Sequence, residues 1–157
     1  LVGEDRLLNA CAAFDTLHQS VAVIDAGTAM TIDFIDGQGT FHGGVITPGA
    51  QLMLDSLTAR SPLLPDVEFD RPAEPIGHNT TEAMQAGVFH GMRGTVREVV
   101  ERIAERVGAF PLVIATGGDA NLLFRDYELI DRVVPDLTLR GLSVTLRVAL
   151  EQNESKE

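Results

Sequence analysis

The most informative stretch of this chain is I-D-A-G-T-A-M-T-I-D, residues 24–33. An apolar run ends on the carboxylate of Asp25, the chain turns at Gly27, and a nearly alternating run begins at Thr28. Short runs of β-branched and apolar residues on either side of a glycine turn are typical of neighbouring antiparallel strands. The turn therefore carries a carboxylate, a glycine and a hydroxyl at the end of a strand.

The rest of the sequence predicts the elements around this turn. Apolar spacing predicts helices over residues 4–18, 50–59, 80–107, 119–125 and 137–150, and short apolar runs predict strands over 21–25, 28–35, 39–46, 111–116 and 128–134. Asn79 or Thr80 caps the longest helix, which ends at Gly108. The proline-rich residues 61–75 are expected to form a surface loop.

The order of these elements predicts an α/β fold. One helix, three strands, two helices and then alternating strands and helices indicate a mixed sheet. An antiparallel three-strand meander is expected at one side, parallel strands at the other, and helices on both faces. At 157 residues, the chain has the length of one domain.

Charge and composition argue against some partners. With 12 Lys and Arg against 23 Asp and Glu, the net charge is -11, which repels nucleic acid and anionic membrane surfaces, so we expect neither as a partner. Cys11 is the single cysteine and cannot form an internal disulfide. Without a leader-like or long apolar segment, the expected location is the cytoplasm. Because the sequence begins at Leu1 rather than methionine, we expect a fragment of a longer protein.

The turn at residues 25–28 has two interpretations. Asp25 can hold a cation or its waters, while Gly27 lets backbone N–H groups and the Thr28 hydroxyl approach a phosphate. Alternatively, the segment is an ordinary hairpin in which Asp and Gly are turn formers. The residues alone leave both open.

Three further motifs are equally ambiguous. In G-E-D-R, residues 3–6, Asp5 suits the positive end of a helix and Arg6 can hold an anion; alternatively, capping chemistry explains Asp5, and Arg6 is a solvated surface cation. G-G-V-I-T-P-G, residues 43–49, brings backbone close to a ligand or to a packed helix. T-G-G-D-A, residues 116–120, is typical of nucleotide crevices and also of simple strand-to-helix turns.

Other kinds of site lose support. The histidines lack metal-like spacing, so a zinc site is not expected. Neither a G-x-S-x-G elbow nor a Walker-type G-K-[ST] occurs, which argues against a serine hydrolase and a P-loop enzyme.

Taken together and in this order, G-E-D-R, I-D-A-G-T-A-M-T-I-D, F-H-G-G-V-I-T-P-G, L-P-D-V, I-G-H-N-T-T-E-A and A-T-G-G-D-A resemble the carboxyl-terminal two-thirds of a type III pantothenate kinase. The resemblance spans residues 2–150. It implies a ribonuclease-H-like lobe of the actin-like ATPase type, from an enzyme that uses ATP to phosphorylate the primary alcohol of pantothenate in coenzyme A biosynthesis. The amino-terminal lobe, with its D-x-G-N-T phosphate motif, is absent from this chain.

The resemblance also implies roles at the substrate. Asp5 would be the general base that accepts the proton of the pantothenate hydroxyl. Gly3, Glu4, Asp5 and Arg6 would form the pantothenate-binding stretch, with Arg6 facing the polar end of the substrate. Thr80 would bind pantothenate across a homodimer interface, and the dimer is expected to form through the helix at 80–107.

At the nucleotide, the resemblance implies a monovalent cation, K⁺ or NH₄⁺, held by Asp25, and Mg²⁺ that accompanies ATP. Thr28, beside Gly27, would touch the ATP phosphates. Gly117 and Gly118 resemble the glycine pair on the adenosine side of the cleft.

Two other functions remain open. One is an actin-fold kinase for another small alcohol, and the other is a non-catalytic regulatory relative. The presence of Asp5, Asp25 and Thr28 together argues against the latter, since a binding module does not need a proton acceptor. With only half a cleft, the fragment alone is expected to be inactive. The kinase interpretation requires the carboxylates of Asp5 and Asp25 to converge on one crevice.

Overall fold

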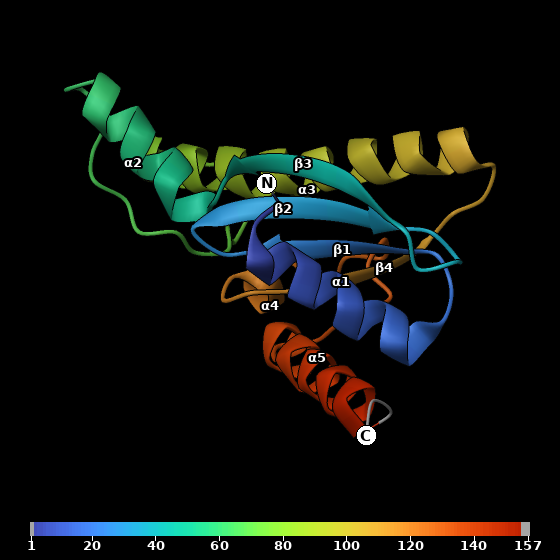
Figure 1. Cartoon of the computed structure of the whole chain (residues 1–157). Helices are drawn as coiled ribbons and strands as arrows, with labels where there is room; N and C mark the ends of the chain where they lie inside the picture. The colour runs from blue at the N-terminus through green and yellow to red at the C-terminus, as the bar shows by residue number, and fades with distance from the viewer. Residues whose placement is uncertain (1, 155–157) are drawn as a thin grey trace.

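A five-stranded mixed sheet forms the centre of the computed structural model, which describes residues 2–154 (Figure 1). The strands are β1 (Val21–Ala26), β2 (Ala29–Ile35), β3 (Phe41–Pro48), β4 (Leu112–Thr116) and β5 (Arg132–Val133). Their order in the sheet is β3-β2-β1-β4-β5. The first three strands pair antiparallel, and β4 lies parallel to both β1 and β5. This confirms the predicted meander with parallel strands beside it.

Helices cover both faces of the sheet. They are α1 (Glu4–Leu17), α2 (Ala50–Arg60), α3 (Thr80–Val107), α4 (Ala120–Phe124) and α5 (Leu137–Glu154). In Figure 1, α3 runs along one side of the sheet, whereas α1 and α5 lie on the other. Within the described residues, no helix combines the length and apolar character needed to cross a bilayer.

Strand periodicity separates the interior into two apolar cores. Ala22, Ile24 and Ala26 of β1 belong to the core on the α3 side, whereas Val21 and Val23 belong to the core on the α1 side. Successive side chains of a strand point to opposite faces, so β1 supplies both cores at once. This alternation also decides which polar side chains of β1 and β2 face α1.

The predicted strand over residues 128–134 is mostly wrong. Only Arg132 and Val133 pair with β4. The preceding residues form turns, in which the N–H of Ile130 donates to the carbonyl of Tyr127 at 2.9 Å. Leu129 and Ile130 pack on the α3-side core from this turn. Their apolar character therefore reflects packing of a loop rather than a strand.

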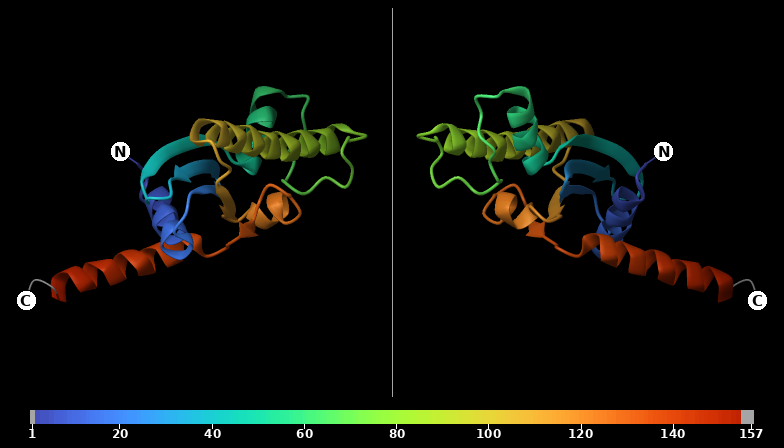
Figure 2. Two further views of the ribbon diagram at one scale, coloured as in Figure 1. Left: turned by 90° about the vertical axis from the view of Figure 1, so that its right-hand side faces the viewer. Right: turned by 90° about the vertical axis from the view of Figure 1, so that its left-hand side faces the viewer.

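The carboxyl-terminal helix extends beyond the sheet. Figure 2 shows α5 crossing α1 and continuing past it as a projecting arm. Exposed apolar side chains lie along this helix: Leu139, Leu142, Leu146, Val148 and Leu150. Only the beginning of α5, where Leu137 is buried, joins the core.

Candidate functional site

Asp25 and Asp33 face the same side of the sheet, the side that α1 covers. Asp25 comes two positions after Val23 in β1, and Asp33 two positions before Ile35 in β2; Val23 and Ile35 belong to the α1-side core. The register pairs Val23 with Asp33. The two carboxylates are therefore diagonal neighbours on adjacent antiparallel strands.

Asp25 is half-buried and is held by a side chain of α1. The Nδ2 group of Asn9 donates to its Oδ2 at 2.9 Å. Burial raises the pKa of Asp25, the hydrogen bond from Asn9 opposes the rise, and the charges of Asp5 and Asp33 add to it. The charge of Asp5, an exposed residue in the first turn of α1, thus acts on Asp25 from the same side of the sheet.

Asp33 is buried and bound to Arg6. The Nε of Arg6 donates to both carboxylate oxygens at 3.0 Å, and its Nη2 also contacts Oδ1. The guanidinium lies 5.7 Å from the centre of the Phe41 ring. A side chain at Gly44 would bring a Cβ within 2.5 Å of Asp33 Oδ1, so glycine there leaves room for the pair. Arg6, expected to face the substrate, therefore also neutralises a carboxylate of its own chain.

One cavity joins segments that lie far apart in the sequence. The turn after β1, the start of α2 and the residues after β4 surround a space of about 390 Å³. Its lining residues are Gly27, Thr28, Gln51, Leu52, Asp55, Gly118 and Asp119. The two motifs that suggested phosphate and nucleotide contacts, residues 25–28 and 116–120, thus meet at one crevice.

At two glycines, the backbone segments around this crevice approach one another closely. Gly117 has a φ of +97°, and a Cβ there would lie 2.4 Å from the carbonyl oxygen of Ala26 and 2.6 Å from Asp25 Oδ1. The N–H of Asp119 donates to the same Ala26 carbonyl at 3.0 Å. A Cβ on Gly49 would lie 2.0 Å from the Gly27 oxygen. Close approach of backbone is therefore one reason for these glycines, whatever the crevice binds.

The remaining predicted site residues lie apart or at the surface. Gly3 and Glu4 are exposed at the start of α1. Thr80 is exposed at the first residue of α3, and no hydrogen bond among residues 2–154 connects its side chain to α1. In the single chain, the helices that carry Thr80 and Asp5, α3 and α1, lie on opposite faces of the sheet (Figure 1).

Sequence reasoning missed Asn9, Asp33 and Asp119. Asp33 could have been found from the alternation of β2, which puts it on the face of Asp25. Arg6 and Asn9 are three positions apart and share a helix face, which is the signal that they act as a pair. Burial raises the pKa of Asp119 at the edge of the crevice, and only the fold shows this burial.

Asp25 is the candidate cation ligand that the sequence named. Within the described residues, no group of three or more His, Cys, Asp or Glu side chains could hold a metal ion. Asp25 offers one half-buried carboxylate, with Oδ1 directed toward Gly117. Such a site fits a weakly held cation, whereas Mg²⁺ is commonly bound through substrate phosphates and waters.

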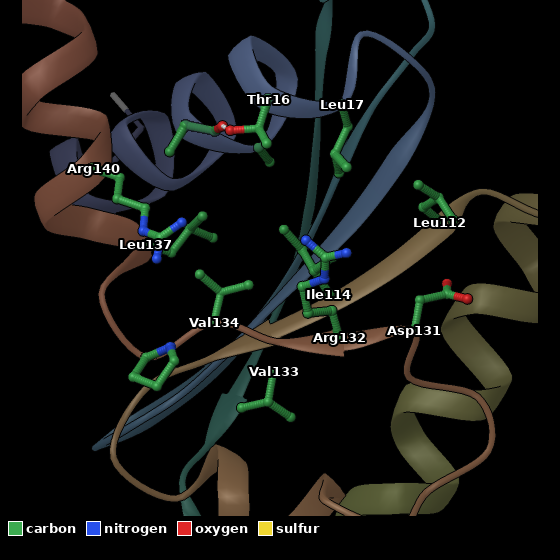
Figure 3. Close-up of a pocket in the computed structure, with 13 residues that line it drawn as sticks. Thr16, Leu17, Leu112, Ile114, Asp131, Arg132, Val133, Val134, Leu137 and Arg140 are labelled. Carbon is green, nitrogen blue, oxygen red and sulfur yellow. Dashed lines mark hydrogen bonds between the residues drawn. The ribbon is translucent and has the colours of Figure 1, made fainter.

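A second cavity lies away from these motifs. Figure 3 shows it between α1, β4 and the start of α5, with Leu17, Ile114 and Leu137 among its apolar walls and Arg132 and Arg140 beside them. Its volume is about 270 Å³. None of the predicted site residues lines it, so it is separate from the crevice.

The chain is similar in sequence to proteins of one known family. A family model described as type III pantothenate kinase matches residues 1–102. A curated type III pantothenate kinase of Akkermansia muciniphila is 46% identical over 143 residues, which cover 91% of this chain and 59% of that protein. The chain thus spans somewhat over half the length of this relative.

Solved structures share the fold. A Baf family transcriptional activator from Campylobacter jejuni matches with a TM-score of 0.69 and 25% identity, over 96% of this chain and 66% of that one. An activator of 2-hydroxyisocaproyl-CoA dehydratase from Clostridium difficile, solved with bound ADPNP, matches with a TM-score of 0.55 and 14% identity, over 98% and 69%. The chain therefore has the fold of an actin-like ATPase lobe.

Proposed function

Because this chain belongs to the type III pantothenate kinase family, we propose that the complete enzyme transfers the γ-phosphoryl group of ATP to the primary hydroxyl of pantothenate, in coenzyme A biosynthesis. One observation carries the proposal: residues 25–28 and 116–120 meet at one crevice, and α1, which carries Asp5 in its first turn, contacts Asp25 through Asn9. The proposal concerns the complete enzyme because the chain spans 59% of its Akkermansia relative.

Asp5 is the proposed general base. Its carboxylate accepts the proton of the pantothenate hydroxyl while that oxygen attacks the γ-phosphorus and the bond to the β-phosphate oxygen breaks. Exposure in the first turn of α1 leaves Asp5 accessible to a substrate. Gly3, Glu4 and Arg6 form the surrounding pantothenate-binding stretch, in which the bond to Asp33 keeps the Arg6 guanidinium in place.

The crevice is the proposed phosphate side. The Thr28 hydroxyl and the backbone at Gly27 contact the phosphates of ATP, and Gly117 and Gly118 approach the adenosine side. Asp25 would hold K⁺ or NH₄⁺, and Mg²⁺ bound with ATP would supply positive charge to the phosphates. Phosphoryl transfer depends mainly on positioning and charge neutralisation, which this set of groups can provide.

A homodimer through α3 is part of the proposal. Small residues share an exposed face of this helix: Ala83, Gly87, Gly91 and Gly94. A Cβ at any of these three glycines would meet nothing within 4 Å. Glycine inside a helix costs about 0.5–1 kcal/mol relative to alanine. Close packing of a second α3 would offset that cost.

Replacement of the general base tests the function. In the complete enzyme, Asp5→Asn should lower kcat for pantothenate by about 10²-fold or more, the usual range for a lost general base. Circular dichroism should show an unchanged fold. Asp15→Asn, which removes a carboxylate further along the same helix, should keep kcat within about twofold, since only a surface ion pair is lost. Unchanged turnover in Asp5→Asn would remove Asp5 from the mechanism, and phosphorylation of other alcohols in preference to pantothenate would reassign the substrate.

A further inference from the structure

We propose that Asn9 is a positioning residue that holds the Asp25 carboxylate in place, and that Thr138 at the start of α5 orients the Asn9 amide. The inference rests on the proposed function, in which Asp25 faces the cation and the phosphates. It assigns a role at the crevice to α5, the last helix of the chain, which no motif of the sequence suggested.

Both ends of the Asn9 amide are occupied. Asn9 is 2% exposed, and its Nδ2 donates to Asp25 Oδ2 at 2.9 Å. Its Oδ1 accepts a hydrogen bond from Thr138 Oγ1 at 2.8 Å. A rotated amide would turn its carbonyl oxygen toward the carboxylate, so the bond from Thr138 favours the one orientation that donates to Asp25.

The composition of α1 shows that this polar contact is specific. The other buried residues of α1 are Ala10, Ala12 and Ala13. Asparagine is a poorer helix former than alanine, and a buried amide is costly unless it is hydrogen-bonded. A polar residue therefore occupies the one buried position of α1 that faces Asp25.

Asn9, the hydrogen-bond partner of Asp25, carries no charge and therefore does not neutralise the carboxylate. Asp33, two strand positions from the residue opposite Asp25, is neutralised by Arg6. Asp25 instead receives a hydrogen bond from a neutral amide. Asn9 thus fixes Oδ2 without supplying a cation, and Oδ1 stays directed toward Gly117, the neighbour of Gly118 in the crevice wall. A carboxylate held in this way keeps its charge for an ion beside the phosphates.

Packing of α5 against α1 sets the position of Thr138. A Cβ at Gly141 would lie 2.1 Å from the carbonyl oxygen of Leu8, so glycine permits the closest approach of the two helices. The position of α5 on α1 therefore determines where Thr138 lies. Thr138 in turn orients Asn9, which holds Asp25.

Potassium binding tests the inference in the complete enzyme. We expect Asn9→Leu to raise the K⁺ concentration at half-maximal effect by about 10-fold or more, the usual cost of losing a residue that orients a metal ligand. Thr138→Val should raise this K⁺ concentration by a smaller factor. Thr138→Ser, which keeps the hydroxyl, should have the K⁺ concentration of the unmodified enzyme. Ser143→Ala, which removes an exposed hydroxyl bonded within α5, is the matched control and should match the unmodified enzyme.

Two measurements should report this change. One is pantothenate phosphorylation as KCl replaces choline chloride at constant ionic strength. The other is the melting temperature over the same titration with ATP and Mg²⁺ present and pantothenate omitted, which needs no turnover. If the complete enzyme did not phosphorylate pantothenate, the proposed function would be wrong. The melting titration would still test the role of Asn9.

The outcomes separate positioning from general stability. A raised half-maximal K⁺ in Asn9→Leu and Thr138→Val, restored in Thr138→Ser, supports the inference. Variants that melt at lower temperature in every salt but respond to K⁺ as the unmodified enzyme does would overturn it. If Asn9→Leu does not fold, the comparison of Thr138→Val with Thr138→Ser decides the result. An unmodified enzyme whose melting temperature is the same in KCl and choline chloride would also overturn it.

Discussion

Asp25 and Asp33 show how the same residue type acquires different properties on one face of a sheet. Both accept hydrogen bonds from side chains of α1: Asp25 from Asn9, and Asp33 from Arg6. A neutral partner leaves a carboxylate charged toward solvent or ligand, whereas a guanidinium compensates it within the protein. In the proposed site, Asp33 therefore supports the structure, and Asp25 belongs to the binding surface.

Breaking the pair of Arg6 and Asp33 should destabilise the fold. Asp33→Asn leaves the largely buried guanidinium without a charged partner, and loss of one member of a buried pair costs about 3 kcal/mol or more. Urea unfolding at pH 7 measures the free energy of unfolding. Asp15→Asn, which breaks a more exposed ion pair, should cost less than about 1 kcal/mol. Equal costs for the two variants would contradict the importance of the Arg6 pair.

Asp36 provides a pH-dependent contact outside the site. The hydrogen bond with His42 and those from the N–H groups of Thr40 and Gln38 lower the pKa of Asp36 from 3.8 to about 2. Because the pKa is lower in the folded state, the stabilisation is present above pH 3.8 and is lost as the pH falls toward about 2.

Carbon NMR of the carboxyl group can follow this titration. In His42→Ala, the pKa of Asp36 should move upward but stay below 3.8, because Thr40 and Gln38 still donate. The variant should also lose less stability than the unmodified protein between pH 4 and pH 2. An unaltered pKa in His42→Ala would show that the backbone N–H groups alone set it.

Helix α3 shows how local signals define an element. The side chain of Asn79 accepts a hydrogen bond from the N–H of Glu82 at 3.0 Å, which makes Asn79 the N-cap among the two predicted candidates. Glu82 in turn accepts from the N–H of His78 at 2.8 Å. At the other end, Gly108 has a φ of +78°, a conformation that glycine adopts without strain.

Removal of the α3 cap should have a modest and specific effect. Asn79→Ala should lower the free energy of unfolding by about 1 kcal/mol, because one N–H at the helix start loses its acceptor. Amide exchange should accelerate at Thr81 and Glu82 before it does at the helix centre. Asn79→Asp, which keeps an acceptor, should retain the stability; if the alanine and aspartate variants are equally stable, the cap is not the cause.

Elements that depend on distant partners were predicted less well. The apolar residues 128–134 resemble a strand, but only Arg132 and Val133 pair with β4. The side chain of Asp131 accepts a hydrogen bond from the N–H of Val113 at 2.7 Å, and the chain before it turns. A short apolar run has the same pattern in a strand and in a packed loop, and only the neighbouring strand distinguishes them.

For the whole molecule, the proposed homodimer through α3 leads to a prediction about association. Gly91→Leu should convert the complete enzyme from dimer to monomer, because a large side chain prevents the close approach of two α3 helices. Leucine is a better helix former than glycine by about 0.8–1 kcal/mol, so the variant should not unfold. Sedimentation equilibrium measures the mass. A dimeric Gly91→Leu would exclude this face.

The local pattern of the sequence determined most of the fold. Strand and helix periods, Asn79, Gly108 and the turn at Gly27 predicted nearly every element and the mixed sheet, because these signals act between residues close in the chain. The motifs also identified residues 25–28 and 116–120, which the structure brings to one crevice.

Only the tertiary structure decided which side chains meet across elements. The bond of Asn9 to Asp25, its link to Thr138 and the pairing of Arg6 with Asp33 depend on how α1 and α5 are rotated and placed over the sheet. Apolar periodicity indicates the face that a helix buries. It does not set the helix's position along the strands, because that position results from the packing of the entire core.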